Sequence, residues 1–88
     1  MSNMFGANLE QLDQLQRRFV EENEAVRLLQ TRISGTLGST AWTGPAAERF
    51  RSAWSGEFVP ALNRLAEALA ENASVVANRR EAIAVATG

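Results

Sequence analysis

The sequence has neither cysteine nor histidine among its 88 residues. Without cysteine, it has no disulfide framework and no thiolate metal site. Without histidine, it also lacks the commonest zinc ligand, the usual partner of a catalytic nucleophile and the usual general base at neutral pH. No pair of carboxylates has a positioned partner that would indicate acid–base catalysis. We therefore expect a protein that is not an enzyme and that binds no cofactor and no metal.

The chain also lacks a strong excess of either charge and a long apolar segment. Nine basic and ten acidic residues give a net charge of −1 without a long run of either sign, so we expect no nucleic-acid partner. The longest apolar run covers residues 82–86, whereas a membrane-spanning helix needs about 20 residues. Residues 1–11 lack the basic and apolar segments of a general secretory signal peptide. The sequence therefore predicts no transmembrane segment and no cleavable signal.

Apolar side chains recur at helical spacing in both halves of the chain, often seven residues apart, as in long amphipathic helices. In the first half, the repeat consists of Phe5, Leu12, Phe19, Val26 and Ile33. In the second half, the stripe consists of Trp54, Phe58, Leu62, Leu65, Leu69, Val76 and Ile83. We predict that these residues pack the helices within a hairpin or against a second molecule.

Residues that stop and start helices separate the two patterns. Gly35 and Gly38 weaken the first pattern, and Thr43-Gly44-Pro45 follows, where proline suits the first turn of a new helix. The sequence predicts a first helix over about residues 5–38, a turn over 39–45 and a second helix over about 45–85. Pro60 interrupts the second helix, so we expect a kink near residues 56–60.

These elements predict an all-α fold in which residues 1–88 form a single domain, an antiparallel hairpin of two helices. A chain this short buries only about 60 to 65% of its unfolded surface when it folds alone. A wide apolar stripe on each helix also leaves one flank that the other helix does not cover. We therefore expect the hairpin to dimerise into a four-helix bundle.

Trp42-Thr43-Gly44 lies at mid-chain, between the two predicted helices. With the chain length, the helix–turn–helix layout and the alanine-rich second half, this tripeptide resembles the WXG family of type VII secretion substrates, which includes the early secreted antigenic target proteins. The resemblance implies a protein that is cytoplasmic before export and is secreted by a type VII (ESX-like) system without a cleavable signal peptide. It implies a homodimer, or a heterodimer with a WXG-family paralogue, and contact with a type VII secretion ATPase. All nine basic residues are arginine, which is a hint of GC-rich coding, as in actinobacteria.

Trp54-Ser55-Gly56 is a second match to the tripeptide. We interpret Trp42 as the motif residue because helix stop and start signals surround it, whereas Trp54 continues the apolar stripe. The residues alone predict that Trp42 is a hydrophobic plug at the end of the hairpin, with its indole N–H bonded locally. The resemblance implies that Trp42, Thr43 and Gly44 also form one half of an export surface.

The other half of that surface, in the resembled family, is a C-terminal motif of tyrosine, three residues and an acidic residue, and this chain has no tyrosine. Ala77 and Glu81 have the spacing of the motif, so they form a possible degenerate signal. The alternative is that Glu81 is a solvated glutamate and that a partner supplies the signal. Arg79-Arg80 has two interpretations, a solvated pair or a contact for an acidic surface or the secretion ATPase.

Three functions fit these observations. The first is a type VII secretion substrate or substrate partner that acts by hairpin dimerisation. The second, which the missing tyrosine favours, is a non-exported adaptor or chaperone hairpin for the helical N-terminal domain of a larger secreted toxin. The third is an unrelated structural homodimer in which the tripeptide match is a coincidence.

Overall fold

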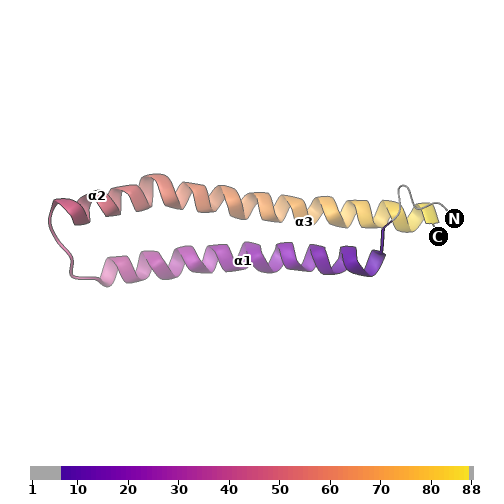
Figure 1. Cartoon of the computed structure of the whole chain (residues 1–88), viewed down its shortest axis with the longest axis horizontal. Coiled ribbons are helices and arrows are strands. Elements are labelled where there is room, and N and C mark those ends of the chain that lie inside the picture. Colours follow the sequence, from indigo (N-terminus) through magenta and orange to yellow (C-terminus); the bar gives the residue numbers. More distant parts are fainter. Residues whose placement is uncertain (1–6, 88) are drawn as a thin grey trace.

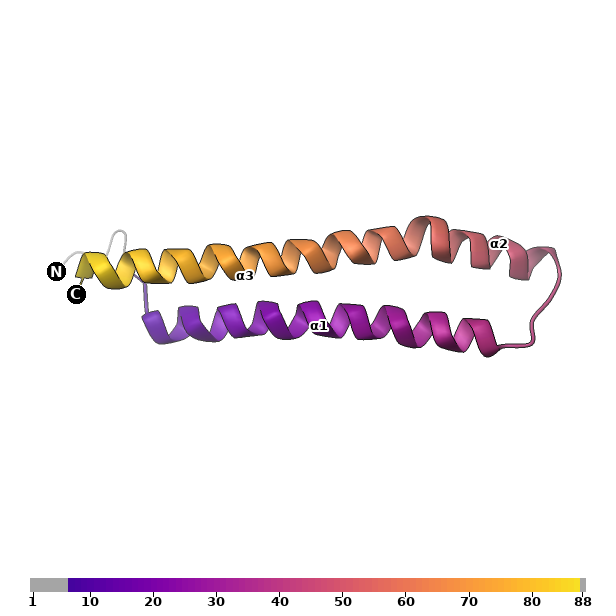
Figure 2. The same cartoon turned by 180° about the vertical axis from the view of Figure 1, so that it is seen from behind.

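The computed structural model describes residues 7–87, and this part of the chain contains helices and no β-strand. Helix α1 spans Leu9–Ser39. The second arm consists of α2 (Pro45–Ala53), the π-helical turn η1 (Trp54–Phe58) and α3 (Val59–Thr87). The two arms lie antiparallel in a rod of 66 × 17 × 15 Å (Figure 1, and from behind in Figure 2). The predicted all-α helical hairpin is confirmed.

Helix α1 begins at Leu9 because Asn8 caps it. The side-chain oxygen of Asn8 accepts a hydrogen bond of 3.0 Å from the backbone N–H of Gln11. This bond satisfies one of the amide groups that have no partner in the first turn of a helix. The sequence pattern placed the start at about residue 5, where the apolar repeat begins, but Phe5 lies outside the described residues.

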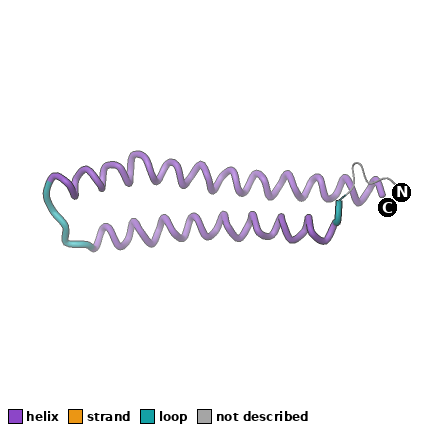
Figure 3. The backbone as a smooth tube through the Cα atoms, viewed as in Figure 1, coloured by secondary structure: helices purple, strands orange, loops and turns teal. Residues whose placement is uncertain are grey.

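A loop of residues 40–44 reverses the chain between α1 and α2 (Figure 3). Gly44 has a φ of 110° and a ψ of 175°, a combination that is almost restricted to glycine and costs other residues about 1–3 kcal/mol. Pro45 follows in the first turn of α2, where its missing N–H is not needed. Gly35 and Gly38 lie within α1, which continues to Ser39.

The second arm contains a π-helical turn immediately before Pro60. The backbone N–H of Val59 bonds to the carbonyl of Trp54, five residues earlier, so the turn holds one residue more than an α-turn. In a regular helix, the proline ring clashes with the carbonyl four residues before it. The wider turn lets the arm continue past Pro60. The sequence predicted a kink at 56–60, and the irregular turn occupies Trp54–Phe58.

Small side chains occupy the contact between α1 and α3. Ala47 on α2 and Ala66 and Ala73 on α3 are the only buried residues of the described chain, and α1 packs mainly on α3, where side chains this small let two helix backbones approach closely. At Ala66 the approach is close enough for the Asn23 side-chain amide on α1 to donate a hydrogen bond to the Ala66 carbonyl on α3. The core is therefore a narrow line of small residues.

The large apolar residues of the predicted stripes flank this line, and none is fully buried. Leu12, Phe19, Val26, Trp54, Leu62, Leu69, Val76 and Ile83 are half-buried, whereas Ile33, Phe58 and Leu65 are exposed. On α1, the row Leu9, Gln16, Asn23, Gln30 and Leu37 is also half-buried. Three polar residues of this row thus turn toward the other arm. The apolar stripe of α1 consequently shares the contact with a row that is partly polar.

Candidate interaction surface

Large exposed apolar side chains gather along one side of the hairpin. We call this side the apolar face, and it consists of Leu15, Leu29, Ile33, Phe50, Phe58 and Leu65, all of them exposed. Ile33 and Phe50 line one groove together with Leu37, so the face crosses from α1 to α2. Exposed apolar residues that share one side of a surface are typical of a site that another molecule covers, although Glu22 separates Leu15 from Leu29 on this side of α1.

Helix geometry aligns the remaining members of the apolar face with this groove. On α1, Leu29 is four residues before Ile33, and Leu15 is two heptads before Leu29, so the three share a side. On the second arm, Phe58 follows Phe50 by eight residues, which is about one α-turn plus one π-turn. Leu65 is seven residues after Phe58. The face therefore extends from the loop end of the rod toward its open end.

The other sides of the hairpin differ in character. Leu28 is exposed to 47%, nearly the same as the 45% of Leu29, but it belongs to the row of Glu21 and Gly35 on the outer side of α1. Val20 borders a shallow groove on the opposite flank, with small and polar neighbours that include Asn23 and Ala73. Isolated exposed apolar residues of this kind are normal on a protein surface.

Trp42 lies in the loop with 40% of its surface exposed. Its ring contacts Phe50 of α2, with the ring centroids 5.9 Å apart. Its backbone carbonyl accepts a 2.6 Å hydrogen bond from the Arg51 guanidinium. The sequence predicted a hydrophobic plug, and the structure places Trp42 at the loop end with part of its ring free, next to the apolar face. Thr43 and Gly44 complete the loop and are exposed.

Trp54, the other tryptophan, connects the two arms. Its indole N–H donates a 2.9 Å hydrogen bond to the Ser34 hydroxyl of α1, and its ring lies 6.2 Å from that of Phe58. The indole bond that the sequence assigned to Trp42 is therefore found at Trp54. A half-buried ring with its N–H bonded across the hairpin has a packing role.

An ion pair joins the two arms near the open end of the hairpin. Arg80 Nε lies 2.9 Å from Asp13 Oδ1, and Arg80 Nη2 lies 3.3 Å from Asp13 Oδ2, so the contact is bidentate. Both side chains are 35% exposed. Arg79 is exposed. The interpretation of Arg79-Arg80 as one solvated pair is therefore wrong for Arg80, because its guanidinium contributes to the hairpin itself.

The two residues with the spacing of the C-terminal motif differ in their surroundings. Ala77 is half-buried and borders the same flank groove as Val20. Glu81 is exposed, four residues later on α3. Neither belongs to the apolar face. Their position leaves both interpretations of Glu81 open as predictions.

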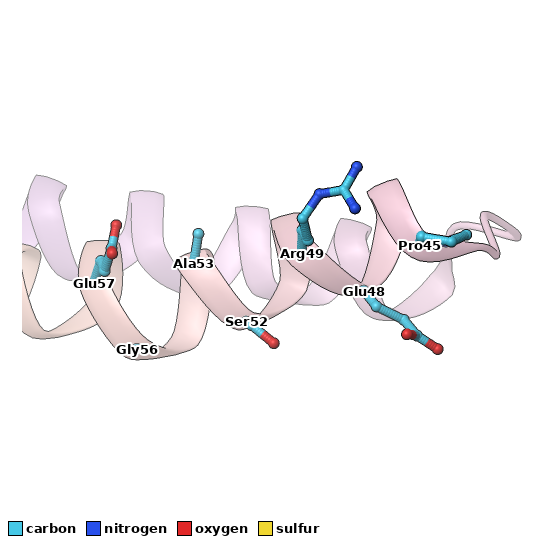
Figure 4. Close-up of a pocket in the computed structure, with 7 residues that line it drawn as sticks. All are labelled: Pro45, Glu48, Arg49, Ser52, Ala53, Gly56 and Glu57. Carbon is cyan, nitrogen blue, oxygen red and sulfur yellow. The ribbon is translucent and has the colours of Figure 1, made fainter.

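Another surface depression does not bring together side chains from the two arms. The depression in Figure 4 is lined by Pro45, Glu48, Arg49, Ser52, Ala53, Gly56 and Glu57. All of these residues come from α2 and η1, and the Arg49 side chain points away from Glu48 and Ser52 (Figure 4). A hollow along a single helix does not enclose a ligand in the way that a binding cleft does. In the described residues, no three acidic side chains gather in a group that would hold a metal ion.

The described helices contain no stretch that is both long and apolar enough to cross a membrane. Comparison with known proteins gave no match to any family model, curated protein or solved structure. The chain's own surface and its mid-chain tripeptide are therefore the features that bear on its function.

Proposed function

We propose that this protein is a type VII secretion substrate, or the partner of one, that pairs with another helical hairpin through its apolar face. The observation that carries the proposal is the combination of this one-sided apolar face with Trp42-Thr43-Gly44 in the loop between the arms. The hairpin supplies the pairing surface, and the loop supplies the tripeptide by which the chain resembles WXG proteins.

The length of the hairpin supports pairing. One whole side of a rod 66 Å long and 17 Å wide covers about 1,100 Å², of which the apolar face is a part, and a stable complex buries about 800 Å² on each partner. Within the described residues only alanines are buried, and the large side chains of the apolar face keep 39–48% of their surface exposed, so a second hairpin that covers them adds apolar burial. The product is the four-helix bundle expected from the sequence, formed with an identical chain or a paralogue.

The exposed part of Trp42 supports the export role. A tryptophan ring that is only partly covered offers apolar area and an N–H donor to a partner such as the secretion ATPase. The chain then travels from the cytoplasm to the outside as a folded dimer. Because the chain has no tyrosine, its partner supplies the aromatic part of the C-terminal signal, unless Ala77 and Glu81 serve in its place.

Two neighbouring leucines on α1 test the pairing step. Leu29→Glu places a charge on the apolar face and is expected to abolish dimerisation, because burying an unpaired carboxylate is very costly. Leu28→Glu makes the same change on the outer side of α1 and is expected to leave the dimer intact. The molar mass in solution is measured for each variant, both alone and mixed with helical hairpins that are encoded by neighbouring genes. Equal behaviour of the two variants would contradict pairing through the apolar face.

A second measurement separates the two leading functions. We expect the protein in the culture medium only when the type VII ATPase is active, with a cytoplasmic marker as the control for lysis. The competing function, a non-exported adaptor or chaperone for a larger toxin, is favoured by the missing tyrosine. It predicts the same pairing surface and no export, so a protein that pairs and stays inside the cell would support the adaptor.

A further inference from the structure

The loop between the arms is held by one side chain from outside it. The Arg51 guanidinium on α2 donates to three backbone carbonyls: Nη1 to Trp42 at 2.6 Å, and Nη2 to Thr40 at 3.1 Å and Leu37 at 3.4 Å. Arg51 is half-buried and takes part in none of the ion pairs found in the described residues. Its charge is therefore directed at the carbonyls where α1 ends.

Helix α1 does not end in the left-handed residue that closes many helices, because Thr40 is extended, with φ −87° and ψ 124°. Its last turn is closed locally by the hydroxyls of Ser39 and Thr40, which donate to the Thr36 carbonyl at 3.2 Å and 2.6 Å. The last turn contains no basic residue to interact with the negative end of the helix dipole. Arg51 supplies this positive charge, together with further hydrogen-bond donors, from the opposite arm.

The backbone bonds of the loop converge on the same acceptors. The Thr40 N–H donates to the Leu37 carbonyl at 3.4 Å, and the Trp42 N–H donates to the Thr40 carbonyl at 2.9 Å. Each of these carbonyls also accepts from Arg51, as a carbonyl oxygen with two lone pairs can. The guanidinium thus connects the end of α1 to Trp42 through a single planar group.

Consecutive residues of α2 hold Trp42 from two sides. Phe50 contacts its ring, with the centroids 5.9 Å apart, and Arg51 binds its carbonyl. The part of the ring that remains exposed, 40% of the residue, therefore has a defined direction. A recognition group that is fixed before binding loses less conformational entropy when its partner binds.

We infer that Arg51 is a positioning residue that shapes the loop and presents Trp42 to the protein that recognises the exported hairpin. This inference rests on the proposed function for its recognition step and on the hydrogen bonds alone for its structural step. Lysine is expected to replace arginine only in part, because an ammonium group lacks the planar fork that reaches several carbonyls together.

The structural step is tested with Trp42 as its own reporter. Trp54→Phe leaves Trp42 as the single tryptophan, and Arg51→Ala, Arg51→Lys and Arg49→Ala are introduced into this background. Arg49 is an exposed residue of the same helix, and its variant is the matched control. Collisional quenching by acrylamide measures the accessibility of Trp42, while circular dichroism measures helix content and thermal stability.

We expect Arg51→Ala to raise the quenching of Trp42 by up to about 2.5-fold, the ratio of full exposure to the present 40%. Arg51→Lys is expected to give an intermediate rise, and Arg49→Ala no change. If Arg51→Ala does not fold, the quenching of Arg51→Lys, which keeps the charge and most of the aliphatic stem, is compared with that of Arg49→Ala instead. Unchanged quenching in a folded Arg51 variant would overturn the inference.

The recognition step is tested by export of the full chain with both tryptophans present. We expect the exported fraction to fall roughly tenfold in Arg51→Ala, which corresponds to the loss of about one charge-assisted hydrogen bond, while pairing and helix content stay unchanged. Normal export of Arg51→Ala with raised quenching would overturn the recognition step. If the unmodified chain is not exported at all, the proposed function fails, and the quenching result still decides the role of Arg51 in the loop.

Discussion

Ala66 lies in a close contact between the two arms, and enlarging it is the sharpest test of the fold. Its side chain is 1% exposed, and its carbonyl accepts the hydrogen bond from Asn23 on the opposite arm. Ala66→Leu adds three carbon atoms where the neighbouring helix leaves no room. Ala68 is exposed on the same helix, so Ala68→Leu adds the same atoms in open space.

The expected cost follows from packing. Overfilling a close contact costs about 1–3 kcal/mol, and moving the arms apart at Ala66 also loses the Asn23 hydrogen bond, worth about 1 kcal/mol. A domain of this size holds only about 3–5 kcal/mol of stability from its core. Each kcal/mol shifts the melting temperature by about 4–8 °C. Ala66→Leu should therefore lower it by about 8–32 °C, whereas Ala68→Leu should change it little.

Thermal unfolding followed by circular dichroism at low protein concentration compares the two variants. Low concentration limits the extra pairing that a new exposed leucine promotes in Ala68→Leu. If Ala66→Leu melts within about 2 °C of Ala68→Leu, which is less than 1 kcal/mol, the arms do not meet through alanines and the reasoning about the core is refuted.

Two further predictions concern the loop and the open end. Gly44→Ala should lower the free energy of unfolding in urea by about 1–3 kcal/mol because of its φ of 110°. Gly35→Ala, where nothing lies within 4 Å of the added carbon, should raise the free energy of unfolding by up to about 1 kcal/mol. If both variants changed this free energy in the same direction, the two assignments would be contradicted. A double-mutant cycle of Asp13→Asn and Arg80→Gln should give a coupling free energy between the two side chains of about 0.5–1 kcal/mol, and this coupling should fall in 1 M salt. Zero coupling at low salt would show that the ion pair does not join the arms.

The heptad repeat of the sequence predicted the helices because amphipathic periodicity is a local property. The glycines and Pro45 likewise indicated where the chain reverses, since their backbone preferences act within a few residues. The start of α1 was predicted too early because the apolar repeat of the sequence begins at Phe5, which precedes Asn8. Asn8 caps the helix at a point that periodicity alone does not mark.

The contacts between the arms were not predictable in the same way. Asp13 and Arg80 are 67 residues apart, and Asn23 and Ala66 are 43 apart, so nothing local relates one partner to the other. The many alanines of the second half did not indicate which of them are buried, because alanine suits both exposed and packed helix positions. Arg51 resembled any solvated arginine until the fold brought the end of α1 beside it.

Local sequence patterns were enough to predict two amphipathic helices, the reversal between them and the place of Trp42 at that reversal. How each helix is rotated about its axis became apparent only in the packed hairpin. That rotation places small and polar residues between the arms and turns Leu29, Phe58 and Leu65 outward. The physical reason is that helix periodicity fixes which residues share a side, whereas the close packing of two backbones decides which side faces inward.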